Sequence, residues 1–365
     1  MRLIRRWFIL LSALATLSLA GWLGGSYAFT QQFPWQSSAG AADLILQQAA
    51  QNAPTVRVTS GNRASATPAP RPTADAHPVA TGSAVTPQPT TMPATTTSAL
   101  TLQHGTLQEG QIHSTFMGGD MPYAIYLPPG YADPANANRR YPVVYMLHGA
   151  PGGYLDWVHA AGADKTADAL ISVGRIPPMI LVMPEGQTNP LHDSEWANGT
   201  PPAAQAESYL VQEVVPYIDT HYRTIAVADD RAIGGLSTGG FAGVNMTLHH
   251  PDIFSIAWSL SGNYLAPQTI LKQNLFTDPA SVAYNSPLQY IQQVKDPQRL
   301  HFYLAVGKTD TTDNTNVETQ QMDQALTAAH VPHLAQYFNG AHSWTFWGLH
   351  LVDALEYIAA NMPAA

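Results

Sequence analysis

Short apolar runs alternate with amphipathic segments along residues 100–365 of this 365-residue chain. The apolar runs are of strand length and most end in glycine, which is typical of β-strands that run into turns. Six such runs are YAIYLPPG (123–130), YPVVYMLHG (141–149), MILVMPEG (179–186), RAIGGL (231–236), FSIAWSLSG (254–262) and LHFYLAVG (300–307). Several are apolar at consecutive positions, which favours parallel strands that are covered on both faces.

The segments between these runs have helical periodicity. Residues 206–222 place Leu210, Val214 and Ile218 on one stripe of a helix. The other helices are expected at 240–249, 315–329 and 347–360. Strands that alternate with helices in this way predict one doubly wound α/β domain with a mostly parallel sheet, over residues 100–365.

The first residues of the chain have the features of an export signal. The basic stretch MRLIRR is followed by an uncharged, apolar run over residues 7–25. Small residues at 18–20 and 26–28 fit signal-peptidase sites, while the run is also just long enough to cross a bilayer. We therefore expect residues 1–28 to be either a cleaved signal peptide or a retained membrane anchor. Both place the rest of the protein outside the cell, secreted or held at the outer face of the cytoplasmic membrane.

Residues 29–99 are predicted to be a linker. From residue 60 onward the sequence is dominated by Ala, Thr, Pro and Ser, which bury too little apolar surface to offset the entropy of ordering the chain. The stretch ADLILQQAA (42–50) is compatible with a short helix. The expected organisation is therefore an export segment, a low-complexity linker and one folded domain.

Composition narrows the possible chemistry. The chain has no cysteine, which excludes disulfides, thiolate metal sites and thiol catalysis. Its formal net charge is −9, and residues 101–365 carry 10 basic and 23 acidic residues. Such an acidic domain repels phosphate backbones, so we expect no nucleic-acid partner.

The stretch GLSTGG (235–240) is a candidate nucleophile motif. It follows the predicted strand RAIGGL and precedes a predicted helix, so Ser237 lies in G-x-S-x-G at a strand–helix turn. In a nucleophile elbow this setting exposes the serine hydroxyl at the edge of the sheet. The alternative is a glycine-rich turn without chemistry, and the strand–turn–helix context favours the nucleophile.

A catalytic serine needs a base and an acid that orients the base. In this fold both follow the serine in the chain, on loops after later strands. His342 has the required position, after LAQYF and before the last helix. Asp310 and Asp313 both follow LHFYLAVG, and we favour Asp310 because it is nearer the rigid strand end.

The same reaction needs two backbone N–H groups that stabilise the developing oxyanion. One is expected from Thr238, directly after the nucleophile, and the other from the loop after the strand at 141–149. In that loop Gly149 allows the chain to turn, so that the Ala150 N–H faces the site. His148 is assigned a structural role.

These pieces together resemble the family of α/β-hydrolases called putative esterases, which includes S-formylglutathione hydrolases, feruloyl and acetyl-xylan esterases, enterochelin esterases and mycolyltransferases. The resemblance rests on YPVVYMLHG, SYLVQEVVPYIDTHYRT, RAIGGLSTGG, SGNY, GKTD and GAHSWTFW, spread over residues 120–357. It implies Ser237 as nucleophile, Asp310 as acid, His342 as base, and the Ala150 and Thr238 N–H groups as oxyanion donors. Where this chain has Thr238 the family often has Met, which keeps the N–H and changes the shape of the pocket.

Together with the export segment, the resemblance implies an exported serine carboxylesterase that hydrolyses an ester of a carbohydrate, a phenolic acid or a similar small molecule, with no metal or organic cofactor. The alternatives are an acyltransferase of the mycolyltransferase type and an S-formylglutathione hydrolase-like thioesterase, although the latter enzymes are usually cytoplasmic. A non-catalytic surface binding module is disfavoured by the intact order of the triad. The sequence leaves the oligomeric state open.

Substrate choice is expected to depend on residues 186–206 and 263–295. Their aromatic and amide side chains either stack on a sugar or aromatic acyl group or simply cover the core. The residues concerned are Trp196, Asn198, Tyr264 and Tyr284. Trp344, which follows His342, is a further candidate for lining the pocket.

Overall fold

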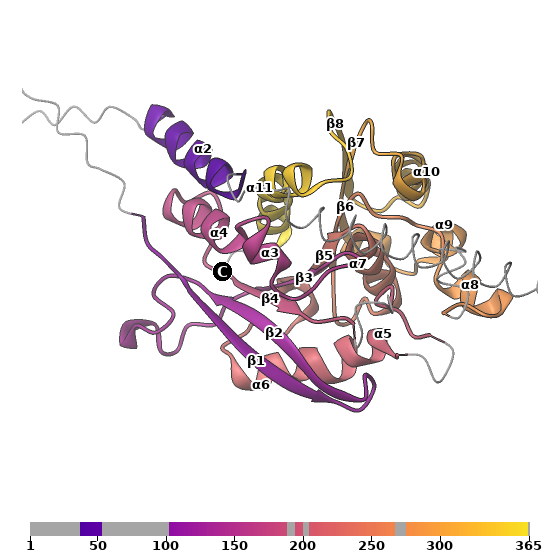
Figure 1. Ribbon diagram of the computed structural model, residues 1–365, viewed down its shortest axis with the longest axis horizontal. Helices are drawn as coiled ribbons and strands as arrows, with labels where there is room; N and C mark the ends of the chain where they lie inside the picture. The colour runs from indigo at the N-terminus through magenta and orange to yellow at the C-terminus, as the bar shows by residue number, and fades with distance from the viewer. Residues whose placement is uncertain (1–36, 53–101, 188–193, 200–203, 267–274, 364–365) are drawn as a thin grey trace, which may run out of the picture.

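A single mixed sheet is the centre of the fold (Figure 1). The computed structural model describes residues 37–52, 102–187, 194–199, 204–266 and 275–363. Within these residues eight strands pair in the order β1-β2-β4-β3-β5-β6-β7-β8. They are β1 Thr106–Ser114, β2 Gly119–Leu127, β3 Val143–Leu147, β4 Ile180–Pro184, β5 Arg231–Leu236, β6 Ile256–Leu260, β7 His301–Gly307 and β8 His333–Phe338. β2 runs antiparallel to both β1 and β4, and all other neighbours are parallel.

The predicted strands and the doubly wound fold are confirmed. β3, β4, β5 and β6 are buried at every position, as consecutive apolar residues require when helices cover both faces. β1 was not predicted, because its sequence TLQEGQIHS is mostly polar and exposed. It is an edge strand, so its pairing with β2, and not an apolar pattern in its own sequence, determines its conformation.

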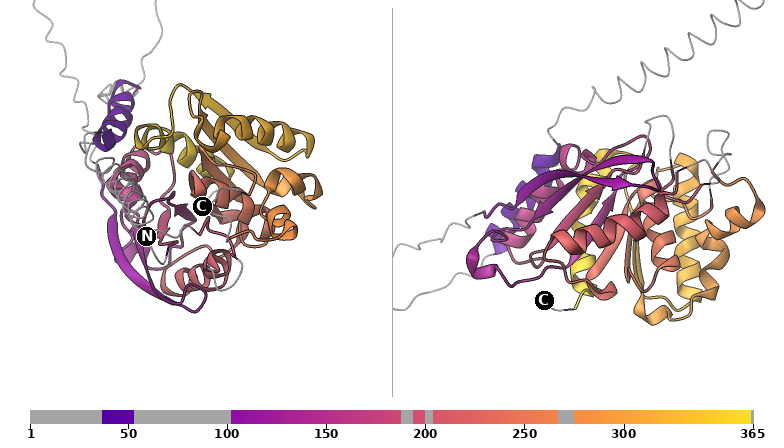
Figure 2. Two further views of the ribbon diagram at one scale, coloured as in Figure 1. Left: turned by 45° about the vertical axis from the view of Figure 1, so that its right-hand side comes forward. Right: turned by 90° about the horizontal axis from the view of Figure 1, so that it is seen from below.

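Helices cover both faces of the sheet (Figures 1 and 2). α4 and α11 pack on one face, with Trp157 of the short α3 between them and the strands. α5, α6 and α7 pack on the opposite face over β3, β4 and β5, and α10 continues that layer over β6 and β7. The helices of these layers are α3 Asp156–His159, α4 Ala163–Ser172, α5 Ala206–Tyr209, α6 Val215–His221, α7 Thr238–His249, α10 Thr315–Ala328 and α11 Trp344–Asn361. The short helices α8 Pro279–Tyr284 and α9 Pro287–Tyr290 lie between β6 and β7 in the chain.

The predicted linker contains a helix that belongs to the folded body. α2, Ser37–Asn52, lies against α4 and α11 (Figure 1). Ile45 is 3% exposed and is part of the main core cluster, while Leu44 beside it is 50% exposed. The short helix that the sequence allowed at 42–50 is thus part of a longer one within the predicted linker, and one apolar stripe is enough to dock it on the domain. Residues 1–28 and the rest of the predicted linker, 29–36 and 53–99, lie outside the described residues.

The carboxyl ends of β3, β5, β6, β7 and β8 lie at one edge of the sheet, because these strands are parallel. This is the edge at which open α/β sheets place their ligand sites. Among the described residues no helix has the length and apolarity needed to cross a membrane.

Candidate active site

Ser237 occupies a sharp turn between β5 and α7. Its backbone φ is +52° and ψ is −119°, a conformation that side-chain-bearing residues rarely adopt. Hydrogen bonds hold the turn on both sides: the Ser237 N–H donates to Leu260 O at 2.9 Å, and the Phe241 N–H donates to Ser237 O at 3.0 Å. The strain therefore persists because β6 and the first turn of α7 fix the backbone.

Two glycines let this turn approach β3. A Cβ atom on Gly235 would lie 1.9 Å from the Leu147 carbonyl oxygen, and one on Gly239 would lie 2.3 Å from the same atom. Backbone atoms cannot move aside as a flexible side chain can, so both positions require glycine. The G-x-S-x-G spacing thus brings the serine to the end of β3, where the following loop begins.

The three predicted triad residues meet at this edge. His342 Nε2 lies 3.1 Å from Ser237 Oγ, and His342 Nδ1 lies 2.9 Å from Asp310 Oδ2. Since an ionised carboxylate only accepts hydrogen bonds, Nδ1 carries a proton and, in the neutral ring, Nε2 faces the serine with a free lone pair. Asp313 is exposed and makes no contact with His342, so the structure agrees with the choice of Asp310.

The Asp310 carboxylate is fully buried, and its environment keeps it ionised. Burial alone would raise the pKa of Asp310, but the hydrogen bond and charge of His342, together with the neighbouring Ser261 side chain, outweigh burial and hold the pKa below its usual value. Ser261 also accepts a hydrogen bond from Trp347 Nε1 at 3.1 Å. Sequence reasoning missed Ser261, and the only available signal was its position just after β6 at the same edge of the sheet.

The loop after β3 lies directly against the nucleophile. A Cβ atom on Gly149 would lie 3.3 Å from Ser237 Cβ and 2.5 Å from Leu236 Cδ1. Within the described residues neither the Ala150 N–H nor the Thr238 N–H donates to a protein acceptor. Both N–H groups are therefore free to donate to an oxyanion, as the sequence prediction requires.

A buried ion pair lies behind this loop. His148 Nδ1 donates to Gly149 O at 2.8 Å, and His148 Nε2 lies 3.1 Å from Glu185 Oε1. Burial lowers the pKa of His148, but Glu185 outweighs burial and raises it overall. The Tyr154 N–H also donates to Glu185, so His148 and Glu185 together connect the loop after β3 to the end of β4.

Trp196 stabilises the same loop from outside. Its Nε1 donates to His148 O at 3.0 Å, and its ring packs against the His148 ring with the centroids 4.8 Å apart. Only 2% of Trp196 is exposed, so the prediction that it lines a substrate pocket is wrong. The indole has its polar edge and its faces occupied by protein, which leaves no free surface for a sugar or an aryl group.

The other predicted lining residues have different surroundings. Tyr264 is 0% exposed and donates to Ser259 Oγ at 2.9 Å, so it is a core residue and not a lining residue. Asn198 is bonded through both side-chain atoms to Ser208. Tyr284 is half exposed and lies away from the triad, against His249.

Trp344 is the predicted lining residue that lies near the triad. Its ring meets Trp347 edge-on at 5.3 Å, and Trp347 in turn meets the His342 ring edge-on at 4.8 Å. Trp344 is partly exposed. Its exposed part is available to contact a ligand, while the buried Trp347 packs against His342.

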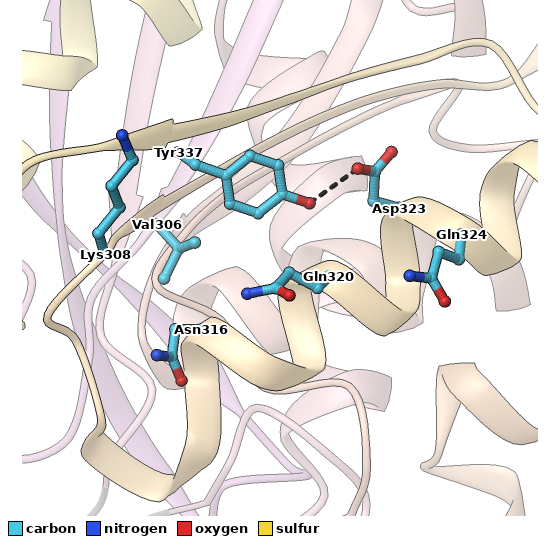
Figure 3. A pocket seen from close by; sticks show the side chains of 7 residues that line it. All are labelled: Val306, Lys308, Asn316, Gln320, Asp323, Gln324 and Tyr337. Carbon is cyan, nitrogen blue, oxygen red and sulfur yellow. Dashed lines mark hydrogen bonds between the residues drawn. The ribbon is translucent and has the colours of Figure 1, made fainter.

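A separate cavity of about 390 Å³ lies between α10 and the ends of β7 and β8 (Figure 3). Most of the residues that line it have polar side chains, and Tyr337 donates to Asp323 within it at 2.7 Å. The lining residues are Val306, Lys308, Asn316, Gln320, Asp323, Gln324 and Tyr337. No triad residue lines it, so it is distinct from the candidate active site.

The strained serine at a strand–helix turn, with a histidine and a buried aspartate from later loops, defines the class of α/β-hydrolase-fold serine hydrolases. The model of the family described as "Putative esterase" matches residues 114–358. The chain belongs to this family.

Relatives and solved structures agree with that membership. An endo-1,4-beta-xylanase/feruloyl esterase of Xylanibacter ruminicola is 33% identical over 184 residues, which are 50% of this chain and 24% of the relative. An esterase of Mycobacterium tuberculosis is 25% identical over 252 residues, 60% of this chain and 51% of the relative. The chain thus spans about a quarter to a half of these two relatives. A solved ferulic acid esterase matches with a TM-score of 0.63 at 24% identity, over 72% of this chain and 100% of the other.

Proposed function

We propose that this chain is an exported serine carboxylesterase that hydrolyses feruloyl, acetyl or related esters of carbohydrates through an acyl-enzyme. The observation that carries the proposal is the continuous hydrogen-bond line from Ser237 Oγ through His342 to Asp310, with distances of 3.1 and 2.9 Å. The unused N–H groups of Ala150 and Thr238 next to Ser237 support the same chemistry.

Each proposed catalytic group acts once in acylation of the serine and once in hydrolysis of the acyl-enzyme. His342 Nε2 takes the hydroxyl proton as Ser237 Oγ attacks the ester carbonyl, and the Ala150 and Thr238 N–H groups stabilise the oxyanion. Collapse of the tetrahedral intermediate breaks the bond to the alcohol, which leaves with the proton from His342. Water then attacks the acyl-enzyme in the same manner, and the free acid and the serine are regenerated. Asp310 keeps the proton on Nδ1 and stabilises the imidazolium.

The proposed substrate class rests on the relatives and on the partly exposed Trp344. The names of the xylanase/feruloyl esterase relative and of the ferulic acid esterase structure point to esters of phenolic acids. An aromatic side chain beside the catalytic base is suited to pack against an aryl acyl group. Export rests on the basic and apolar character of residues 1–28.

The test compares the wild type with Ser237→Ala. A fluorophosphonate probe should label the wild type at Ser237 alone, and the variant should remain folded and lose ester turnover by several orders of magnitude. Ser281→Ala, which changes a serine that caps α8, serves as the control and should keep both labelling and turnover. Turnover that survives in Ser237→Ala would overturn the assignment of the nucleophile.

Product analysis separates hydrolysis from acyl transfer. Methyl ferulate and an acetylated xylo-oligosaccharide are incubated with and without a sugar acceptor, and the products are resolved by mass spectrometry. We expect the free acid as the main product in both cases. Acylated sugar as the main product would instead establish an acyltransferase that uses the same triad.

A further inference from the structure

A buried cluster of ligating side chains lies at the end of α7 that is remote from the catalytic serine. His249 Nδ1 lies 3.0 Å and His250 Nε2 lies 2.8 Å from Glu207 Oε1. One ligand atom from each of the three residues lies within 4.8 Å of the other two. α7 has 12 residues and is therefore about 18 Å long, so the cluster is well separated from Ser237. The esterase chemistry uses none of the three residues.

The hydrogen bonds of His249 fix which of its nitrogens carries a proton. His249 Nε2 lies 3.0 Å from the Tyr284 carbonyl oxygen, which can only accept. Nε2 is therefore the protonated nitrogen of the neutral ring, and Nδ1 directs a lone pair at the Glu207 carboxylate. Two acceptors then face each other, unless the ring is an imidazolium or a cation lies between them. A histidine whose outer N–H donates to a backbone carbonyl is the usual arrangement around a metal ion.

The two carboxylate oxygens of Glu207 differ in their contacts. Its Oε1 also lies 3.2 Å from the Tyr284 hydroxyl, so three groups converge on that oxygen, while the buried Oε2 has no hydrogen-bond partner among the described residues. The Glu207 side chain is only 4% exposed, so this unused oxygen is shielded from solvent.

We propose that Glu207, His249 and His250 bind one divalent transition-metal ion, with zinc as the best match. Two imidazoles and one carboxylate, with a water molecule at the fourth position, form a known ligand set for zinc, with metal–ligand distances of about 2.0–2.2 Å. Tetrahedral geometry then separates the ligand atoms by about 3.4 Å. The observed separations of 3.0 and 2.8 Å from Glu207 Oε1 need to widen by only about half an ångström. Nitrogen ligands favour zinc over magnesium or calcium.

The ion would join parts of the fold that are distant in the chain. Glu207 is in α5, both histidines are at the end of α7, and Tyr284, which stacks on His249 at 3.9 Å, ends α8. The His250 side chain is 26% exposed, which gives the ion a path from solvent. The role of the site is structural. The ion would hold α5, which precedes β5 in the chain, against the end of α7, and Tyr284 of α8 stacks on one of its ligands.

The test uses the full-length protein, stripped of metal with a chelator and then titrated with Zn²⁺ against a chromophoric competitor. We expect one Zn²⁺ per chain and a higher thermal unfolding temperature, because binding to the folded state alone stabilises it. Bound Co²⁺ should give the visible absorption of a four- or five-coordinate site. Turnover of a soluble ester should not change on chelation, so failure of this site would leave the triad untouched.

Variants assign the ligands. His249→Gln and His250→Gln should each weaken Zn²⁺ binding by about 100-fold or more, because each removes a direct ligand and loss of an outer-shell partner alone costs about 10- to 100-fold. His333→Gln is the matched control, because His333 pairs with Asp323 at 3.0 Å without being one of the three clustered ligands. It should leave the affinity unchanged.

Three results would overturn the proposal: less than one equivalent bound by the wild type at micromolar Zn²⁺, wild-type affinity in both histidine variants, or an equal loss in His333→Gln. Should a variant not fold, the wild type still decides. Zn²⁺ must then protect His250 from diethylpyrocarbonate, as read by peptide mass spectrometry, and equal modification with and without Zn²⁺ refutes the site. Equal modification would mean that Glu207, His249 and His250 form a hydrogen-bonded cluster without a metal ion.

Discussion

Replacement of Asp310 by Asn tests the arrangement of the triad most directly. The Asp310 carboxylate is fully buried and lies 2.9 Å from His342 Nδ1. Opposite unit charges at that distance attract by about 6 kcal/mol at an effective dielectric constant near 20. This attraction stabilises the imidazolium only in the transition state, and its loss corresponds to about a 10⁴-fold decrease in kcat. The same change in serine proteases also costs about 10⁴.

The Asp310→Asn substitution should lower kcat more than it weakens substrate binding. An Asn side chain fits the same space, but its amide can donate to Nδ1 and favour the tautomer with a proton on Nε2, which cannot accept from Ser237. The assay is single-turnover and steady-state hydrolysis of a p-nitrophenyl ester, with circular dichroism to establish folding.

Asp313→Asn is the matched control for this change. The Asp313 side chain is exposed, and its backbone oxygen, which the substitution keeps, accepts from Asn263 at 2.8 Å. Its kcat should stay within about twofold of the wild type, as expected for a surface change away from the reacting atoms. A decrease of less than tenfold in Asp310→Asn, or a larger loss in Asp313→Asn, would refute the reasoning.

Three further predictions concern the loop after β3 and α2. The raised pKa of His148 and the lowered pKa of Glu185 mean that their pair contributes fully between about pH 4.3 and 6.5 and loses that contribution as pH rises through the raised pKa of His148. Urea denaturation should thus show Glu185→Gln about 3 kcal/mol less stable than the wild type at pH 5.5, with a smaller gap at pH 8.5; an equal gap at both would contradict the assignment. Trp196→Phe removes the donor to His148 O at 3.0 Å and should lower kcat about tenfold with KM little changed, and an unchanged kcat would count against a positioning role. Ile45→Ala should destabilise the domain by about 2–4 kcal/mol in the same denaturation assay, whereas Leu44→Ala, at a 50% exposed position, should cost under about 0.5 kcal/mol.

The sequence was sufficient where local pattern and chain order carry the information. The buried parallel strands were predictable because consecutive apolar residues distinguish them from amphipathic helices. Ser237, His342 and Asp310 were predictable because the fold fixes the order in which such groups occur, and the structure brings the three together.

Other features depended on contacts that no local pattern encodes. The aromatic residues Trp196 and Tyr264 look alike in sequence whether they face a ligand or the core, and only tertiary hydrogen bonds to His148 and Ser259 reveal the second case. Ser261 acquires its role from the approach of β6, β7 and α11 to one point. β1 was missed because an exposed edge strand needs no apolar pattern.

Because α2 packs on the domain, the long low-complexity segment that follows it does not separate the domain from a membrane anchor in the exported protein proposed above. With α2 held on α4 and α11 by Ile45, residues 53–101 connect two points of the same body, since β1 follows at Thr106. A retained anchor at residues 1–28 would then be joined to the domain only through residues 29–36, which span at most about 29 Å when fully extended. The 49 residues that follow α2, which could span about 170 Å, would add nothing to that distance. In an anchored form the start of α2 would therefore stay within about one membrane thickness of the lipid surface, and the domain would meet only substrates that come to the membrane.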